Sequence, residues 1–310
     1  MRKAVKLGYT TILPNLALSN DEGRLLVMWG EPRSTTPPPT FHTMAFTNRL
    51  AILAGGLGGL GCATGKLLHA HGAKLALLYA PAEAERLQPT VAETYGYQNT
   101  SEAGDSIKGY ACDITSPDSV SEAFSAIAQD NVAFPAMLVN AAGYVNLTAL
   151  ETFPPEDALK HYVINLFGPT LTGQAFARMY IERKKAEGEG KAAPGRIVNI
   201  ASQAAHVALW HHGPYCASKA GLIGLSKCMA SEWGPHGITT NTISPGPIMT
   251  EMGKKAWSDP AAREEYLKSV PTGSFADPDE VARIVHFLCE DKAKSINGND
   301  VRLDGGFTIR

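Results

Sequence analysis

Short apolar runs alternate with longer amphipathic stretches from residue 48 to the end of the chain. Strand-like runs separated by helix-like segments predict an α/β fold, in which helices cover both faces of a parallel sheet. The helix-like segments include residues 61–72, 116–129, 164–185 and 218–234. The seven predicted strands are RLAILAG (49–55), AKLALLYA (73–80), IKGYACD (107–113), AMLVNAAG (136–143), GRIVNIAS (195–202), GITTNTISPG (237–246) and NDVRLDGG (299–306).

The first 44 residues differ from this pattern. They contain the Pro- and Thr-rich cluster EPRSTTPPPT and no segment that would pair with the predicted sheet. Basic residues near the start suggest a targeting peptide, but three acidic residues do not fit a mitochondrial presequence. We expect residues 1–44 to be a loose extension, disordered or artefactual, with a targeting segment as the alternative and Met44 as an alternative start. Residues 45–310 then form the folded domain.

Composition narrows the functional classes. The 310 residues are 44% hydrophobic and 19% charged, with a formal net charge of −2 and no long basic block, which argues against nucleic acid or an anionic membrane as the main partner. Five widely spaced cysteines without a C-x-x-C pair favour free thiols in a reducing compartment. The longest uncharged runs are interrupted by Asn, Gly and Pro, so none is predicted to span a bilayer. We expect a soluble, cytoplasmic protein.

Glycines cluster where the first predicted strand meets the first helix, in AGGLGGLG at residues 54–61. Glycines at such a junction let backbone N–H groups approach a phosphate closely, and a helix N-terminus favours negative charge. Tight turns and close packing also use glycine runs. The position at the first strand–helix junction nevertheless favours a pyrophosphate cradle for a dinucleotide.

A tyrosine and a lysine four residues apart, Tyr215 and Lys219, follow Pro214. If a helix begins near this proline, the two side chains lie on one face. They would form either an acid/base pair or a surface cation resting on a ring. A tyrosine alone is a poor base at neutral pH, because its unperturbed pKa is about 10. A nearby ammonium group stabilises the phenolate and lowers that pKa.

Several motifs resemble those of the short-chain dehydrogenase/reductase family, in the family's order across nearly all of residues 48–307. Gly55, Gly59 and Gly61 match the T-G-x-x-x-G-x-G spacing, with Ala54 in place of the threonine. CDIT at 112–115 resembles the end of the third strand, and VNAAG at 139–143 resembles N-N-A-G with Ala141 at the second asparagine. ISPGPIMT at 243–250 resembles the segment that closes over the nicotinamide. The resemblance implies a doubly wound Rossmann-type domain with a seven-stranded parallel sheet that binds NAD or NADP.

The resemblance also implies a catalytic set. Ser202 lies thirteen residues before Tyr215, the family's interval for the serine that orients the substrate oxygen. Asn165 matches the asparagine that supports a water-linked proton path to the lysine. Outside this context Ser202 would be a turn or cap residue and Asn165 a helix residue bonded to backbone. Tyr215 is then the general acid/base, and Lys219 tunes it and holds the nicotinamide ribose. The implied cofactor-binding residues are Gly55, Gly59, Leu60, Gly61, Tyr79, Asp113, Ile114, Asn140, Ala141, Gly143, Tyr215, Lys219, Pro245, Gly246, Ile248 and Thr250.

Three histidines, His206, His211 and His212, lie between the predicted serine and tyrosine. They have no acidic or cysteine partner at recognisable ligand spacing, so pocket lining or surface is favoured over metal binding, and no metal is expected. The substrate is expected to contact residues 144–147, 203–212 and 250–274, the last of which is a mobile lid in the family. The residues proposed to touch substrate from that lid are Met252, Trp257 and Tyr266.

The choice between NAD and NADP depends on the end of the second strand. Tyr79 stands where an acidic residue would bond the ribose 2′-hydroxyl of NAD. No arginine or lysine lies within residues 56–58 or at Ala80 to bind a 2′-phosphate. Without an acidic residue at this position the 2′-phosphate of NADP is not repelled, but no basic residue at the expected positions attracts it. NADP is therefore favoured, with NAD as the alternative.

The resemblance implies an NAD(P)-dependent short-chain alcohol dehydrogenase or carbonyl reductase. Hydride transfer would interconvert a secondary alcohol and a ketone, with a polyol, ketose or secondary-metabolite carbonyl as the small-molecule substrate. The helices that follow Asn165 and carry Tyr215 resemble the family's dimer-forming helices, which implies a homodimer or homotetramer. A non-catalytic nicotinamide-binding sensor or scaffold is the alternative, although such proteins typically lose the tyrosine or the lysine. An epimerase usually has a larger C-terminal domain, and a hydrolase would need a G-x-S-x-G elbow.

Overall fold

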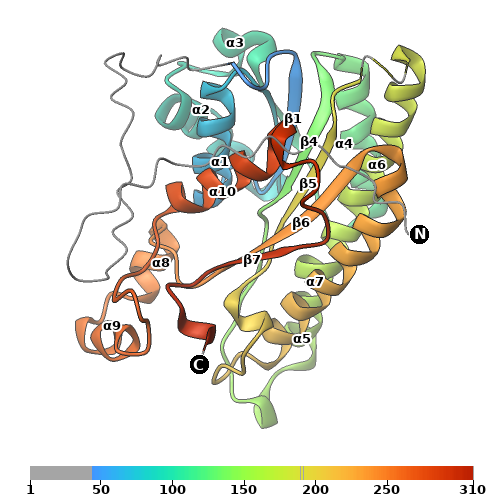
Figure 1. The fold of residues 1–310 in the computed structure, drawn as a ribbon. Coiled ribbons are helices and arrows are strands. Elements are labelled where there is room, and N and C mark those ends of the chain that lie inside the picture. The colour runs from blue at the N-terminus through green and yellow to red at the C-terminus, as the bar shows by residue number, and fades with distance from the viewer. Residues whose placement is uncertain (1–43, 189, 191, 310) are drawn as a thin grey trace, which may run out of the picture. The chain divides into compact units, whose positions relative to one another are not determined.

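The computed structural model describes residues 44–188, 190 and 192–309. The predicted N-terminal extension, except for Met44, lies outside these residues. The described chain forms one seven-stranded parallel sheet in the order β3-β2-β1-β4-β5-β6-β7 (Figure 1). The predicted doubly wound α/β fold is therefore confirmed. The strands are β1 (Arg49–Ala54), β2 (Lys74–Tyr79), β3 (Ile107–Ala111), β4 (Phe134–Asn140), β5 (Gly195–Ile200), β6 (Ile238–Pro245) and β7 (Asp300–Leu303).

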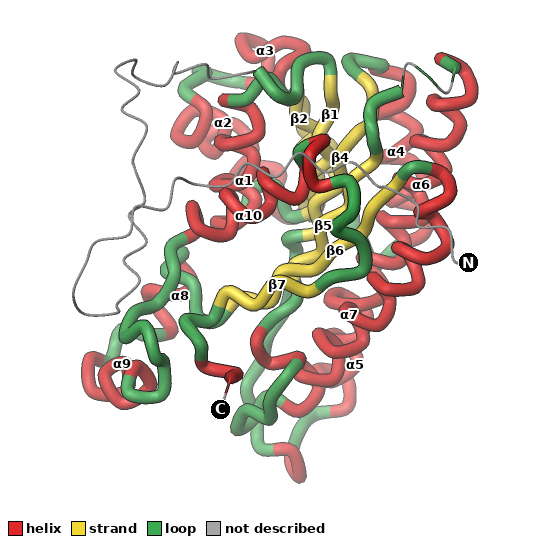
Figure 2. The backbone as a smooth tube through the Cα atoms, viewed as in Figure 1, coloured by secondary structure: helices red, strands yellow, loops and turns green. Residues whose placement is uncertain are grey.

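Helices cover both faces of the sheet. Figures 1 and 2 show α1 (Gly59–Ala70) beside α10 (Pro278–Cys289) on one face, and α4 (Pro117–Asp130), α6 (Gly168–Glu187) and α7 (Gly213–Trp233) on the other. In the described part of the chain no helix is both long and apolar enough to cross a membrane. The remaining helices are α2 (Leu87–Tyr95), α3 (Thr100–Ala103), α5 (Pro155–Tyr162), α8 (Glu251–Ala256) and α9 (Pro260–Leu267).

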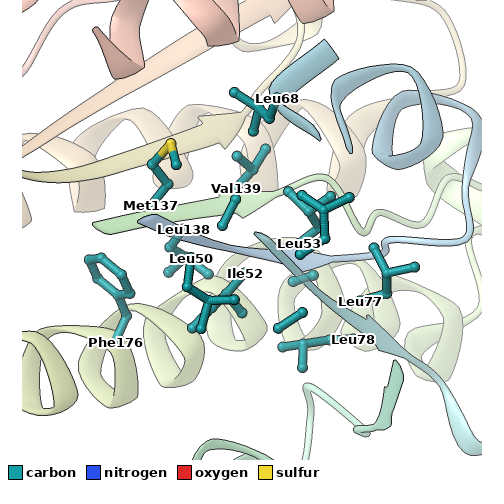
Figure 3. Packing of buried hydrophobic residues seen from close by; sticks show 14 of the residues in the cluster. Leu50, Ile52, Leu53, Leu68, Leu77, Leu78, Met137, Leu138, Val139 and Phe176 are labelled. Carbon is teal, nitrogen blue, oxygen red and sulfur yellow. The ribbon is translucent and has the colours of Figure 1, made fainter. Parts of the chain in front are cut away.

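The core lies where β1 and β4 pair at the centre of the sheet. Both strands are buried on both faces, because helices cover the sheet on each side. In Figure 3, Leu50 and Leu138 lie on the side of Phe176 of α6, whereas Val139 lies on the side of Leu68 of α1. The strand order also reverses at this pair, and in open α/β sheets ligands bind at the carboxyl ends of strands beside such a switch point.

A network of buried polar side chains crosses the same region. Asn140 Nδ2 of β4 donates to Asn199 Oδ1 of β5 at 2.8 Å, and Asn199 Nδ2 donates to Ser226 Oγ of α7 at 2.8 Å. Thr172 Oγ1 of α6 donates to Asn140 Oδ1 at 2.8 Å. Two strands and two helices are thus joined by hydrogen bonds in a low-dielectric interior, where each bond is strengthened.

Two local features differ from the sequence expectation. The helix-like segment 218–234 extends back to Gly213, which meets the condition that a helix begins near Pro214, because a proline fits the first helical turn, where its missing N–H leaves no bond unmade. The segment predicted as one helix over 164–185 starts with a π-helical turn, Val163–Phe167, which precedes α6. Single π turns inside helices often occur at functional sites.

Candidate active site

Tyr215 and Lys219 lie on one face of α7, as their spacing predicts. The Lys219 Nζ atom is 5.8 Å from the centroid of the Tyr215 ring. The lysine is buried and donates to the carbonyl oxygen of Ile200, at the end of β5, at 2.8 Å. This pair is therefore an interior one, and the alternative of a cation resting on a surface ring is excluded.

Burial dominates the electrostatics of this pair. It raises the pKa of the Tyr215 phenol, while a hydrogen bond with Ser202 acts in the opposite direction. It lowers the pKa of Lys219 to about 8. Sequence reasoning expected the lysine to lower the pKa of Tyr215. In this structure burial has the larger effect, so the net direction is the reverse.

Ser202 follows the carboxyl end of β5 and precedes the 3₁₀ turn η5 (Gln203–Ala205). Its Oγ accepts the Ala204 N–H at 3.2 Å, which fixes the side chain, and its hydroxyl also bonds to Tyr215. Because both hydroxyls meet at one point, a substrate oxygen bound there can accept a hydrogen bond from each. The predicted roles of Ser202 and Tyr215 in catalysis stay a prediction.

The π turn holds Asn165 in the interior. Asn165 Oδ1 accepts the Tyr144 N–H at 2.7 Å, and Nδ2 donates to the Tyr144 carbonyl at 2.8 Å and to Ser218 Oγ at 3.0 Å. A Cβ placed on Gly143 would lie 3.6 Å from both Asn165 Oδ1 and Lys219 Nζ. Asn165 therefore joins the loop after β4 to the helix that carries the lysine.

The glycine-rich loop needs its three matched glycines. Gly55 has φ +81°, and a Cβ there would lie 2.7 Å from the backbone N of Ala142. A Cβ on Gly61 would lie 2.2 Å from the carbonyl oxygen of Gly55, and one on Gly59 would lie 2.7 Å from the methyl group of Thr250. The loop is therefore packed closely against the segments after β4 and β6.

This loop suits a pyrophosphate. The residue before α1 is Gly58, which has no side chain to cap the helix, and the N–H groups of a first helical turn have no acceptor within the helix. Leu60 lies in that first turn and is half-buried. A dinucleotide phosphate would meet these donors and the positive end of the helix dipole. The residues present thus fit a nicotinamide dinucleotide.

The other predicted cofactor residues lie at the carboxyl edge of the sheet. Tyr79 ends β2, and Asp113 and Ile114 follow β3, where the Asp113 carboxylate accepts bonds from Thr115 N (2.9 Å) and Oγ1 (2.7 Å). The Asn140 side chain is engaged in the buried network, so its contribution to a cofactor would come from the main chain. Ala141 donates its N–H to Ala54 O at 2.9 Å.

The segment after β6 completes the predicted cofactor set. Pro245 is the last residue of β6, and Ile248 forms a parallel bridge with Ala276. Thr250 caps α8 by accepting the Gly253 N–H on its Oγ1 at 3.2 Å, while its methyl group faces the glycine loop. The matched motifs therefore lie along the carboxyl edge of the sheet, on both sides of the switch point.

An aromatic cluster lies in the segment predicted as a lid. The Tyr266 ring stacks on Phe307 with centroids 5.2 Å apart and an interplanar angle of 8°, and Trp257 lies 4.6 Å from Tyr266. Phe275 packs against both Trp257 and Tyr266. Gln203, next to Ser202, donates its Nε2–H to Tyr266 Oη. The segment predicted as a lid is thereby connected to the turn after β5. Met252 lies on α8, and its side chain is outside the described part of the structure.

Gln203 also holds a buried acceptor. It is 4% exposed, and its Oε1 has no hydrogen-bond partner among the residues that the structure describes. A Cβ on Gly246 would lie 3.1 Å from this oxygen. The free acceptor therefore lies between the Ser202 turn and the predicted nicotinamide segment.

The three histidines have different surroundings. His206 Nε2 lies 2.9 Å from Asp300 Oδ2, His211 is exposed, and the His212 ring lies 6.0 Å from that of Tyr215. Trp210, another residue of the predicted substrate segments, is 90% exposed. In residues 44–309, as far as they are described, no three His, Cys, Asp or Glu side chains are grouped so as to hold a metal ion.

Comparison with known proteins decides the family. A family model described as Enoyl-(Acyl carrier protein) reductase matches residues 55–308. The chain belongs to the short-chain dehydrogenase/reductase family. It is 39% identical over 262 residues to a D-threitol dehydrogenase of Mycolicibacterium smegmatis, covering 84% of this chain and 94% of the relative. It is 35% identical over 266 residues to an NAD-dependent glycerol dehydrogenase of Listeria innocua, covering 85% and 95%.

A solved structure agrees with this membership. The short-chain dehydrogenase/reductase of Serratia marcescens superimposes with a TM-score of 0.72 and 27% identity, over 85% of this chain and 99% of that one. As a member of this family the chain is an NAD(P)-dependent oxidoreductase, an alcohol dehydrogenase or carbonyl reductase. The identification made from the sequence motifs is confirmed.

Two residues of this dehydrogenase were missed by sequence reasoning. His161 is fully buried; its Nε2 accepts the Asn146 N–H at 3.0 Å and its Nδ1 donates to Asp157 O at 2.7 Å, so it holds the loop after β4. Its position one helical turn before Asn165 was an available signal. Arg86 donates from Nη2 to the Leu57 carbonyl in the glycine loop at 2.8 Å, a contact that no local pattern predicts.

Proposed function

We propose that this dehydrogenase interconverts a polyol and the corresponding ketose and uses NADP. The observation that carries the proposal is the buried Gln203 Oε1, which has no hydrogen-bond partner among the described residues and belongs to the residue next to Ser202. A buried acceptor without a partner is costly, by about 1–3 kcal/mol, so the site suits a substrate with a second hydroxyl next to the reacting carbon. The names of the threitol and glycerol dehydrogenases support the same substrate class.

Each catalytic side chain has a role in this reaction. A bound nicotinamide supplies the hydride for reduction and accepts it in oxidation. Tyr215 donates its phenolic proton to the carbonyl oxygen as the alcohol forms, and Ser202 donates a hydrogen bond to the same oxygen. In oxidation Tyr215 takes the hydroxyl proton back.

The proton on Tyr215 must then be replaced. Lys219, whose pKa burial lowers to about 8, can gain or lose a proton near neutral pH. Asn165 fixes the Tyr144 backbone beside it and so orients the path by which a water reaches the lysine. Each reduction of a ketose would thus take one proton from solvent through Lys219 and Tyr215.

We also propose a cytoplasmic homodimer or homotetramer. Leu159, Tyr162 and Phe167 are exposed apolar residues of the segment that leads into α6, which suits contact with a second copy. All five cysteines are free thiols, which suits a reducing compartment. Light scattering after size-exclusion chromatography measures the assembly. A monomer at micromolar concentration would contradict the proposed assembly.

The substrate is tested by turnover. Purified protein is mixed with NADPH and ketoses, or with NADP and polyols that include threitol and glycerol, and nicotinamide absorbance is followed. We expect turnover with a polyol or ketose, and a fall in kcat of about a thousandfold in Tyr215→Phe, the range for lost acid–base catalysis. Tight cofactor binding without turnover across the panel would instead support the non-catalytic sensor. Unchanged turnover in Tyr215→Phe would contradict the assigned acid/base.

A further inference from the structure

A guanidinium group lies at the edge of the cofactor loop, although the sequence has no basic residue at the expected positions. Arg86 ends η1 (Pro81–Arg86), the 3₁₀ helix that follows β2. Its Nη2 donates to the carbonyl oxygen of Leu57 at 2.8 Å, and Leu57 is within the glycine loop. The contact joins residues 29 positions apart. A cation is thus brought to the gap between the loop and the end of β2.

Glu83 holds this guanidinium in place. Arg86 Nη1 donates to Glu83 Oε1, one turn earlier in η1. The other carboxylate oxygen, Oε2, accepts the Ala80 N–H at 3.4 Å. Glu83 therefore links Arg86 to the backbone directly after Tyr79.

The remaining donors of Arg86 face an exposed space. A guanidinium has five N–H donors, and the bonds to Leu57 and Glu83 use two of them. The Arg86 side chain is 54% exposed, so the others are open to a ligand. In Rossmann-type folds the adenosine ribose lies at the carboxyl end of the second strand, beside the glycine loop. Arg86 contacts Leu57 in the glycine loop and Glu83 in the turn after β2, so it lies beside the expected position of this ribose.

We propose that Arg86 binds the 2′-phosphate of NADP and that Glu83 positions it. A phosphate ester carries a charge of about −2 and accepts several hydrogen bonds, which the planar guanidinium fork matches. Tyr79 at the strand end leaves room for the phosphate without a competing acid. The alternative is that the Glu83 carboxylate accepts the 2′-hydroxyl of NAD. The proposal builds on the NADP preference proposed above.

Binding of cofactor fragments tests this without catalysis. Isothermal titration of the full chain with adenosine 2′,5′-bisphosphate and adenosine 5′-monophosphate compares ligands that differ only in the 2′-phosphate. We expect Arg86→Gln to weaken the bisphosphate and NADPH at least about tenfold, since a hydrogen bond to a charged group is lost. The monophosphate and NADH should change less than about twofold. Arg86→Lys should fall between, because it keeps the charge but not the fork.

A matched control is Lys74→Gln, which removes a positive charge from the opposite end of β2. It should leave all four affinities unchanged. Equal weakening of NADPH and NADH in Arg86→Gln would mean that Arg86 only supports the loop through Leu57, and would overturn the proposal. The proposal would also be overturned if Arg86→Gln changed none of the four affinities. If, in addition, Glu83→Gln weakened the binding of NADH alone, Glu83 would be assigned to the 2′-hydroxyl of NAD.

The outcome is separable from that of the polyol proposal. Arg86-dependent bisphosphate binding without polyol turnover would leave the 2′-phosphate site standing and remove the substrate. If polyol turnover depends on Tyr215 but Arg86→Gln keeps its affinity for NADPH, the polyol proposal stands and the 2′-phosphate site is removed.

Discussion

At the scale of single residues, burial disfavours the charged form of Lys219. It is buried, and its pKa is lowered from 10.5 to about 8. The folded protein therefore binds fewer protons than the unfolded chain between these two pH values. The free energy of unfolding must then rise with pH across this window. The charged lysine thus destabilises the fold at neutral pH, where the proposed chemistry needs it.

Removing Lys219 removes this pH dependence. From pH 7.5 to 10 we expect the free energy of unfolding of the wild type to rise by about 2 kcal/mol relative to Lys219→Met, since one pKa unit corresponds to about 1.4 kcal/mol. Urea unfolding at several pH values measures the difference. Lys227→Met, an exposed lysine on the same helix, should follow the wild type. A constant difference between wild type and Lys219→Met would contradict a lowered pKa.

At the scale of elements, the glycine loop gives a matched pair of substitutions. A Cβ on Gly61 meets the Gly55 carbonyl at 2.2 Å, whereas a Cβ on Gly58 meets it at 3.4 Å, an ordinary contact. Gly61→Ala should lower stability by about 1–3 kcal/mol through overpacking and weaken NADPH binding. Gly58→Ala should leave stability nearly unchanged. Thermal unfolding and cofactor titration measure both effects, and similar values for the two variants would show that the loop tolerates the clash.

The lid segment makes a second prediction. In Tyr266→Phe the stack on Phe307 can remain, while Gln203 Nε2 loses its acceptor and its amide is free to turn. Because one hydrogen bond contributes about 0.5–1.5 kcal/mol, we expect KM for the polyol to rise about three- to tenfold. The kcat value should change less than about twofold. Steady-state kinetics separate the two. A fall in kcat alone would assign Tyr266 to the chemical step.

The strands and the motif positions could be predicted because they depend on local patterns. All seven strands overlap the predicted runs, since buried parallel strands are apolar throughout. The π turn at Asn165 could not, because it depends on the bonds that Asn165 makes to Tyr144 and Ser218. Arg86 was missed for a similar reason: its contact with Leu57 depends on how η1 folds back over the loop.

At the scale of the whole molecule, a histidine pair between α1 and α10 makes stability depend on pH. The rings of His71 and His286 lie 4.3 Å apart, and Phe46 packs against His286. Burial and the neighbouring His71 lower the pKa of His286, although Glu290 opposes them. A histidine with a lowered folded-state pKa contributes stability above its ordinary pKa of about 6.5, and this is lost as the pH falls.

Replacing His286 should reduce acid sensitivity. We expect the melting temperature of the wild type to fall more steeply between pH 7.5 and 5 than that of His286→Phe. Differential scanning fluorimetry across this range measures the slopes. His236→Phe, a substitution at an exposed histidine, is the control and should match the wild type. A steeper fall in His286→Phe would contradict the direction of the pKa shift.

The buried network of Asn140, Asn199, Thr172 and Ser226 has a consequence for how the chain finds its fold. Sliding β4 past β5 by one residue would separate Asn140 from Asn199 and leave their polar partners on α6 and α7 unpaired in the interior. An apolar pair of strands would resist such a slip less. The network therefore disfavours a shifted strand register during folding. Because the native register is favoured, Ser202 after β5 and Tyr215 on α7 keep their native separation.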